Sequence, residues 1–383
     1  MKHLKTLILI TILIIPPLDS KEYKLEYAPN LKLTKDSIAN FQILKSLDLF
    51  LSNINNDYEY IPNVDSSEKI ETYILIDEII SLDSRVIKED TNTFDPYITN
   101  LLPLKDSTYL ASISYLGINE SIPLYRATIE LVLKKDKENF SISSPLSIKT
   151  NNWNYINNGN YKVIYDFNID ESEASILLTY ITNYDKILGN DDIKSTYYFT
   201  TNSSNLLDII GVQFKSDYNG ITTGSLKYDL EKENLVVLGN KNYDPHDLWH
   251  SRLSLLKPRK DCFKFIDEGC AYLYGGSWGY SWNEILIEFE KQVVDKGNND
   301  WLSLKSSPSY FMTGKFKNSA DYIITALIIN EVEQKYGYEG VRELINLNPE
   351  NDSIDDYYSI LNRLVNVNEN NYNERVNQIL KNH

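Results

Sequence analysis

The chain has 383 residues, a length typical of two or three domains rather than one. Hydrophobic residues make up 42% of it, which is enough to build packed cores and excludes a disordered protein. The formal net charge of −16 at pH 7 would repel the phosphates of nucleic acids and of anionic membrane surfaces, so we exclude both as partners.

The N-terminus has the layout of a targeting segment. Lys2 and Lys5 precede an apolar run at residues 7–15, which two prolines end, and the small Ser20 follows. This run is too short to span a bilayer comfortably, whereas a secretory signal needs only a short apolar core. We therefore expect residues 1–20 to be a signal peptide and the mature protein to be secreted or periplasmic, without stable membrane insertion. An uncleaved anchor is the alternative.

Residues 21–145 predict a small α+β domain. Asp36 or Ser37 is expected to begin a helix, and a second short helix is expected at 71–83. The first helix would bury one apolar stripe, made of Ile38, Phe41, Leu44, Leu47, Leu51 and Ile54. Alternating apolar residues at 109–115 and 125–133 then predict strands of an antiparallel meander, continued by Phe140 and Ile142. This order of elements resembles NTF2-like and cystatin-like folds. The resemblance is one of architecture, and no sequence motif supports it.

A second domain is expected at 160–383, after a linker at 145–159 that is rich in Asn, Ser and Thr. It opens with a strand at 161–167 and a helix that begins with a capping box at Asp170 and Glu173 and ends at Gly189. Further strands are expected at 194–200, 221–228 and 235–238, with a short helix near 205–211, and helices follow from residue 240 to the end. The whole chain is therefore expected to be α+β.

His246 and His250 stand four residues apart in the segment Asp-Pro-His-Asp-Leu-Trp-His. Four residues is about one helical turn, so both imidazoles project from one face. Pro245 suits the first turn of such a helix and Asp244 suits its cap. Neutral imidazole is a good ligand for zinc, so we expect this helix to supply two ligands of a zinc site.

Glu268 follows eighteen residues after His250, and a hairpin of two helices would bring it back as a third protein ligand. Three protein ligands leave a fourth position for water, which is typical of catalytic zinc. Asp267 is expected to orient one of the histidines.

These segments resemble the gluzincin metallopeptidase superfamily, in particular its peptidase-MA-like branch. That family has His-Glu-x-x-His and then Glu-Gly-x-Ala on a following helix, and here His246, His250 and Glu268-Gly269-Cys270-Ala271 match it. The resemblance covers residues 160–346. It implies Zn²⁺ bound by His246, His250 and Glu268, a general base at position 247, and a peptide or protein substrate in a groove beside an edge strand at 220–228. It also implies a C-terminal helix at 320–336.

Two positions depart from the family pattern. Asp247 stands where the family has glutamate, and Leu273 stands where it often has an aromatic residue. Because aspartate is shorter, we expect peptide hydrolysis to be slow or absent. The alternative is a catalytically inactive, peptidase-like binding protein that recognises peptides or proteins. In a third interpretation the N-terminal domain is the functional part and the rest is a scaffold.

Several neighbouring residues allow two interpretations. Arg252 and Arg259 suit a substrate carboxylate, but solvated helix charges are the favoured interpretation. Tyr272 and Tyr274 suit an oxyanion donor, but packing is favoured.

The tryptophans and cysteines of this region also allow more than one interpretation. The tryptophans Trp278, Trp282 and Trp301 could line a cleft, but core packing is favoured. Cys262 and Cys270 would lie about 12 Å apart on one continuous helix, beyond disulfide reach, so free thiols are favoured over a disulfide or zinc ligation.

Overall fold

The computed structural model describes residues 25–54, 61–84, 94–219, 226–230, 234–297 and 299–382. The expected signal peptide lies outside these residues. The fold is α+β, as expected, with two compact units: residues 1–147 together with 210–219, and residues 148–209 together with 220–383. Within the described residues, no helix combines the length and the apolar character needed to cross a membrane.

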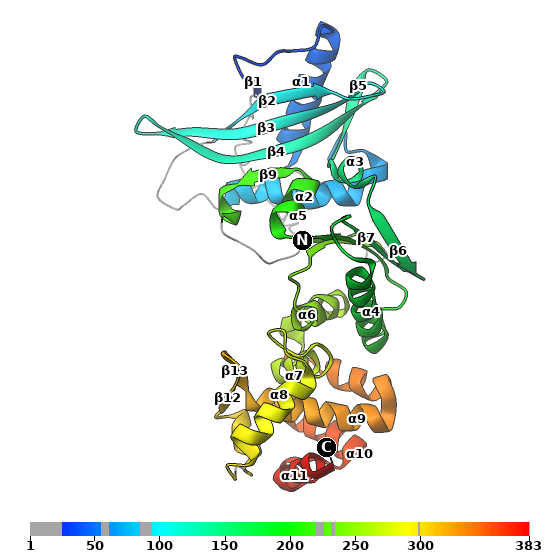
Figure 1. Ribbon diagram of the computed structural model, residues 1–383, viewed down its shortest axis with the longest axis vertical. Helices are drawn as coiled ribbons and strands as arrows, with labels where there is room; N and C mark the ends of the chain where they lie inside the picture. The colour runs from blue at the N-terminus through cyan, green and yellow to red at the C-terminus, as the bar shows by residue number, and fades with distance from the viewer. Residues whose placement is uncertain are drawn as a thin grey trace, which may run out of the picture. The chain divides into compact units, whose positions relative to one another are not determined.

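Unit 1 is built on an antiparallel meander, as the alternating runs predict. The described strands follow the order β1 (Glu26–Tyr27), β2 (Asp95–Pro103), β3 (Thr108–Asn119), β4 (Ile122–Asp136) and β5 (Asn139–Ser143), and β9 (Val212–Lys215) also pairs with β4. Helices α1 (Ser37–Ile54) and α2 (Lys69–Ser84) accompany this sheet (Figure 1). The sequence does not predict that 210–219 returns to this unit.

Helix α1 begins where expected, because the Asp36 carboxylate accepts hydrogen bonds from the backbone N–H groups of Ile38 and Ala39. The predicted apolar stripe is wrong at its start, since Ile38 and Phe41 are 68% and 67% exposed. The helix buries a neighbouring face instead, which includes Ala39, Ile43, Leu47, Phe50, Leu51 and Ile54.

Unit 2 begins with a mixed sheet in the described order β10 (Leu226–Leu230), β11 (Asn234–Asn240), β8 (Lys194–Thr200), β7 (Tyr161–Tyr165) and β6 (Asn154–Asn158). The three central strands are parallel, and β10 and β6 pair antiparallel at the two edges. The part of the expected edge strand that is described, β10, does lie at an edge.

The segment 145–159 is not a plain linker. It contains the short helix α3 (Leu146–Thr150) and the edge strand β6. Most residues of β6 are exposed to solvent, so its polar composition reflects an exposed edge strand rather than a loop.

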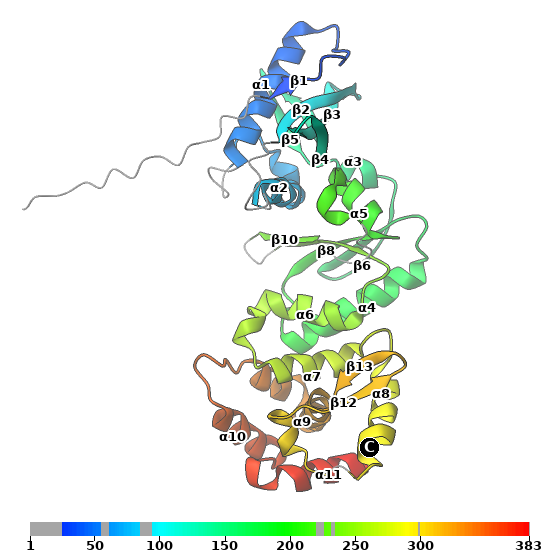
Figure 2. The ribbon, with the colours of Figure 1, turned by 90° about the vertical axis from the view of Figure 1, so that its left-hand side faces the viewer.

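Helix α4 (Glu171–Leu188) has the expected capping box and ends at Gly189, whose φ of 80° is left-handed. It contacts α6 (Pro245–Leu256) near the sheet (Figure 2). The short helix α5 (Ser203–Ile210) follows β8.

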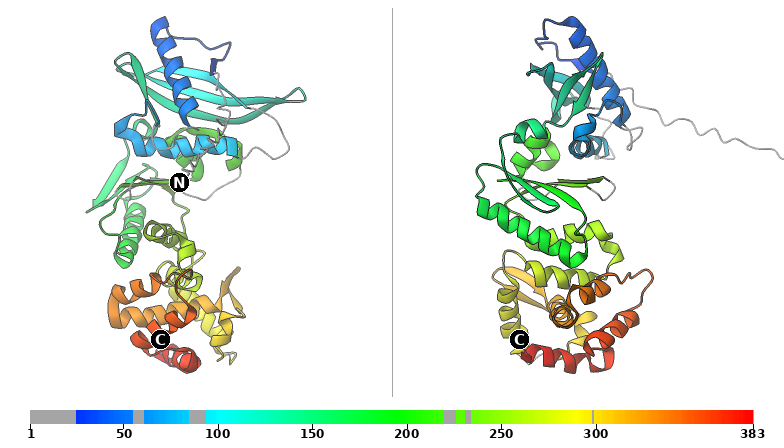
Figure 3. Two further views of the ribbon diagram at one scale, coloured as in Figure 1. Left: turned by 180° about the vertical axis from the view of Figure 1, so that it is seen from behind. Right: turned by 90° about the vertical axis from the view of Figure 1, so that its right-hand side faces the viewer.

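The C-terminal part is helical, with a small hairpin inserted. Helix α9 (Ala320–Ile345), interrupted at Gly337, is contacted by α7 (Lys264–Gly275), α8 (Trp282–Phe289), α10 (Ile354–Val365) and α11 (Tyr372–Asn382) (Figure 3). The hairpin consists of β12 (Tyr310–Thr313) and β13 (Phe316–Ser319).

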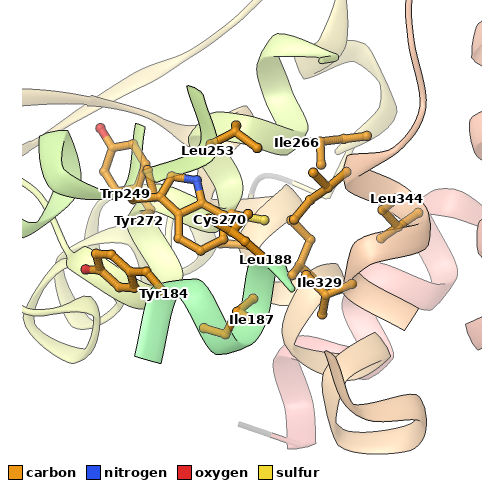
Figure 4. Close-up of a cluster of buried hydrophobic side chains, with 14 of the residues drawn as sticks. Tyr184, Ile187, Leu188, Trp249, Leu253, Ile266, Cys270, Tyr272, Ile329 and Leu344 are labelled. Atoms are coloured by element: carbon orange, nitrogen blue, oxygen red, sulfur yellow. The ribbon is translucent and has the colours of Figure 1, made fainter. Parts of the chain in front are cut away.

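A continuous apolar core joins α4, α6, α7 and α9 (Figure 4). Trp249 of α6 is fully buried and meets Tyr184 of α4 edge to face, with ring centroids 5.5 Å apart. Cys262 and Cys270 are free thiols buried in the same core, as favoured. This packing fixes α6 and α7 against one another.

Arg252 is not a solvated helix charge. Its guanidinium is fully buried and forms a two-pronged ion pair with Asp185 of α4, with Nε 2.7 Å from Oδ1. The Tyr197 hydroxyl and the Ser195 Oγ each lie 3.2 Å from it. Arg252 therefore ties α6 to α4 and β8 from inside the core.

Candidate metal centre

The start of α6 sets the direction of both histidines. The Asp244 carboxylate caps the helix by accepting a hydrogen bond from the His246 N–H at 3.0 Å, and Pro245 occupies the first turn. The two imidazoles are buried and meet edge to face, with centroids 4.8 Å apart. The predicted cap, first-turn proline and shared helix face are all present.

Helix α7 packs back on α6 and brings Glu268 to the histidines. Its Oε2 lies 3.3 Å from His246 Nε2 and 3.8 Å from His250 Nε2, and the three candidate ligand atoms all lie within 4.8 Å of one another. Ligands about 2.0–2.2 Å from a tetrahedral zinc ion stand about 3.3–3.5 Å apart. The two distances from Glu268 Oε2 are close to this spacing, and the 4.8 Å limit for the whole set is wider, so the histidines would have to move closer together around a zinc ion.

The outer nitrogens of both rings have oxygen partners. His246 Nδ1 lies 2.8 Å from the carbonyl oxygen of Gly276, and His250 Nδ1 lies 2.7 Å from Oδ1 of Asp267. A carbonyl oxygen only accepts, so His246 Nδ1 carries a proton, and in the neutral ring Nε2 then has the lone pair. The hydrogen bond expected from Asp267 is present, and both rings present Nε2 to the centre, as metal-ligating histidines do.

Two glycines at the end of α7 make the Gly276 contact possible. A side chain at Gly275 would come within 2.7 Å of the Pro245–His246 backbone, so the two helix ends touch there. Gly276 has a φ of 70°, and a Cβ at this position would meet the Tyr280 carbonyl oxygen at 2.0 Å. The contact therefore depends on how the chain turns after α7 at these two glycines.

Arg259 borders the centre, instead of projecting freely into solvent. Its Nε donates to Asp267 Oδ2 at 2.8 Å, and its Nη2 lies 3.1 Å from Glu268 Oε1 and 3.3 Å from His250 Nε2. Because guanidinium only donates, His250 Nε2 must accept there, which again gives it a lone pair. Arg259 thus holds the outer oxygen of Glu268, and the inner oxygen faces the histidines.

The surroundings of the two carboxyl groups favour their ionised forms. Burial by itself raises the pKa values of Asp267 and Glu268, but His250 and Arg259 outweigh it for Asp267. For Glu268 the two histidines outweigh it, so both pKa values lie below their usual range. Burial lowers the pKa of His246, but Glu268 and Gly276 more than compensate and raise it. Two ionised carboxylates therefore lie beside the imidazoles, and the raised pKa of His246 means that a cation there would compete with a proton.

Asp247 lies in the first turn of α6, exposed, one residue after His246. Within the described part of the chain its carboxylate has no hydrogen-bond or ion-pair partner, and it lines a cavity on the neighbouring face of α6. It is therefore accessible from this cavity, which neither histidine lines.

Most of the aromatic residues near the centre pack in the interior, and one lines the cavity. Tyr272 is buried with its ring 5.0 Å from that of His246, and its hydroxyl donates to Asn318. The Tyr274 hydroxyl donates to Glu333, so both tyrosines pack as favoured. Trp301 fills the core, whereas Trp278 is 55% exposed and lines the cavity.

Comparison of the chain with protein-family models, with curated proteins and with solved structures found no match.

We expect Asp267→Ala to weaken zinc binding by about 10- to 100-fold, because His250 loses the carboxylate that orients its ring. Competition with a chromophoric chelator measures this affinity. Asp261→Ala is the matched control, since that carboxylate lies in the adjoining turn Arg259–Asp261. Equal affinities of the Asp267→Ala variant and the wild type would contradict the orienting role.

Proposed function

We propose that this protein is a zinc-dependent, gluzincin-like peptidase with weak activity. The observation that supports this most is the convergence of His246 Nε2, His250 Nε2 and Glu268 Oε2, with both Nδ1 atoms hydrogen-bonded to oxygen acceptors. A pair of histidines on a helix is common. A pair whose outer nitrogens are both fixed by acceptors, facing a carboxylate, is typical of metal centres.

The reaction is hydrolysis of a peptide bond. When bound, zinc lowers the pKa of a coordinated water molecule toward ~7 and polarises the carbonyl group of the substrate. The Asp247 carboxylate takes a proton from the attacking water and gives it to the leaving nitrogen. The water oxygen bonds to the carbonyl carbon, the C–N bond breaks, and an acid and an amine are released.

A place for the substrate backbone is available at the edge of the sheet. Strand β10 is an antiparallel edge strand in the described sheet order, and an extended peptide can add to such an edge through main-chain hydrogen bonds. Asp247 belongs to α6, which follows β11 in the chain. The cavity that Asp247 lines is also lined by residues of β11, the strand that pairs with β10.

The rival function, a peptidase-like protein that binds peptides without cleaving them, is favoured by one observation. Aspartate is one methylene shorter than glutamate, which places its carboxylate about 1.5 Å further from the water. A misplacement of about 1 Å can cost ~10²-fold in rate.

We therefore expect Asp247→Glu to raise turnover by about 10²-fold and Asp247→Ala to lower it. Turnover of a quenched peptide library by the three proteins, each with verified zinc content, is the measurement. A fast wild type that the glutamate variant does not exceed would show that aspartate is a competent base. Three inert proteins with zinc bound would instead favour the alternative, a protein that binds peptides without cleaving them.

A further inference from the structure

A cavity of about 540 Å³ lies on the face of α6 next to the histidine pair. Six apolar or aromatic side chains from α4, β8, β11, α6 and the loop after α7 form its walls: Leu177, Tyr197, Phe199, Val237, Leu248 and Trp278. This volume falls within the ~300–1,000 Å³ range of ligand pockets, whose walls are mostly apolar. The cavity is therefore a candidate binding site in its own right.

The cavity exists because one strand position lacks a side chain. Val237 and Gly239 of β11 pair with Tyr197 and Phe199 of β8, and these four residues point to the same face of the sheet. Opposite Phe199, therefore, no side chain fills the inner face. A Cβ built on Gly239 would meet no atom within 4 Å.

One wall of the cavity is fixed by the same residue that caps α6. Asp244 accepts from the His246 N–H through Oδ1 and from the Trp278 N–H through Oδ2, both at 3.0 Å. The Trp278 ring stacks on Phe316, with centroids 4.9 Å apart and planes 1° apart. The aromatic wall at Trp278 is therefore held in place by Asp244 and Phe316, close to the start of the helix that carries the histidines.

The charges around the cavity restrict what it can hold. Of the described residues that line it, Asp244 and Asp247 are acidic and none is basic. An acidic group would be repelled and would find no cation, so carboxylates and phosphates are unsuitable occupants. The apolar walls favour an uncharged aromatic or aliphatic group.

We propose that this cavity binds one large apolar side chain, aromatic or long aliphatic, of the peptide substrate. The inference rests on the proposed function for the position of the peptide backbone, because Asp247, the proposed general base, lines the cavity. Gly239 is then the residue that sets the size of the accepted side chain.

The test uses the series Gly239→Ala, Gly239→Val and Gly239→Phe. The φ of Gly239 is not left-handed, and a Cβ at this position meets no atom within 4 Å, so the backbone accepts a side chain here. Ser251→Leu fills the cavity from α6 instead and serves as an independent variant. Blocked pentapeptides with Phe, Leu, Ala or Glu at the centre and glycine elsewhere are the probes.

Equilibrium binding of these probes is measured by calorimetry, with and without zinc, alongside zinc content. We expect Phe and Leu peptides to bind about 10-fold or more tightly than the Ala peptide, since each methylene in an apolar pocket is worth ~10- to 200-fold. The Glu peptide should bind weakest. The preference should shrink stepwise along the Gly239 series and in Ser251→Leu, while zinc content stays unchanged.

The outcomes separate this inference from the proposed function. A wild type without apolar preference, or variants that keep it, would overturn the cavity assignment even if zinc is bound. If the protein binds no zinc but keeps an apolar preference that depends on Gly239, the cavity assignment stands and the proposed peptidase function is wrong.

Discussion

Replacing His246, His250 or Glu268 by alanine should abolish stoichiometric zinc binding, which we expect at about one zinc per chain in the wild type. Each substitution removes one of the three proposed protein ligands among the described residues. A site with two remaining protein ligands no longer satisfies a catalytic zinc centre, so it should fail rather than weaken slightly. Elemental analysis after zinc reconstitution and dialysis measures the loss.

The controls are charged residues at exposed positions near or beyond the centre. Lys260→Ala alters the turn beside Arg259, and Glu339→Ala removes an exposed carboxylate from α9. Both variants should keep the zinc content of the wild type. A wild type that retains no transition metal after reconstitution would contradict the centre, and so would alanine variants that keep the metal.

Much of this centre can be predicted from local sequence, because local interactions build it. The cap at Asp244, the proline in the first turn and the spacing of the histidines each act within one or two helical turns. Bringing Glu268 back requires only that two consecutive helices pack antiparallel.

Other parts of the centre depend on contacts that no local pattern encodes. The Gly276 carbonyl reaches His246 only because the chain turns tightly after α7, and Arg259 meets three polar groups at once. The cavity arises from a glycine that faces a strand forty residues earlier in the chain. Only the folded sheet brings those positions together.

Two errors in the fold predictions have similar causes. Helix α1 carries apolar residues on more than one face, so the three-and-four spacing fits an exposed stripe as well as the buried one. Strand β6 is polar because it lies exposed at a sheet edge, which its composition cannot distinguish from a loop. In each case the tertiary neighbour, rather than the local pattern, decides burial.

Arg252→Ala should destabilise unit 2 by about 3–5 kcal/mol, because it leaves Asp185 buried without its cation. Both side chains are fully buried, and the partners lie 67 residues apart in the chain, which is why the sequence favours a solvated arginine. Burial already raises the pKa of Asp185 above its usual range, against the lowering effect of Arg252. Removing Arg252 removes that lowering effect and raises the pKa of Asp185 further.

The expected pH dependence follows from that raised pKa. A carboxyl group whose folded-state pKa exceeds its unfolded value stabilises the fold below the unfolded pKa, and this contribution is lost as the pH rises through the folded pKa. The penalty of Arg252→Ala should therefore be smaller in mild acid than at pH 8.

Tryptophan fluorescence during urea unfolding measures this penalty selectively, because all five tryptophans, Trp153, Trp249, Trp278, Trp282 and Trp301, belong to unit 2. The double variant Asp185→Leu with Arg252→Met is the matched control, since an apolar pair of similar volume leaves no buried charge. It should recover most of the lost stability. A single variant that costs less than about 1 kcal/mol, or a double variant no more stable than the single one, would show that the pair does not anchor α6. The same measurement decides which variants near His250 can be compared for zinc, because a loss of metal is informative only in a chain whose α6 remains in place.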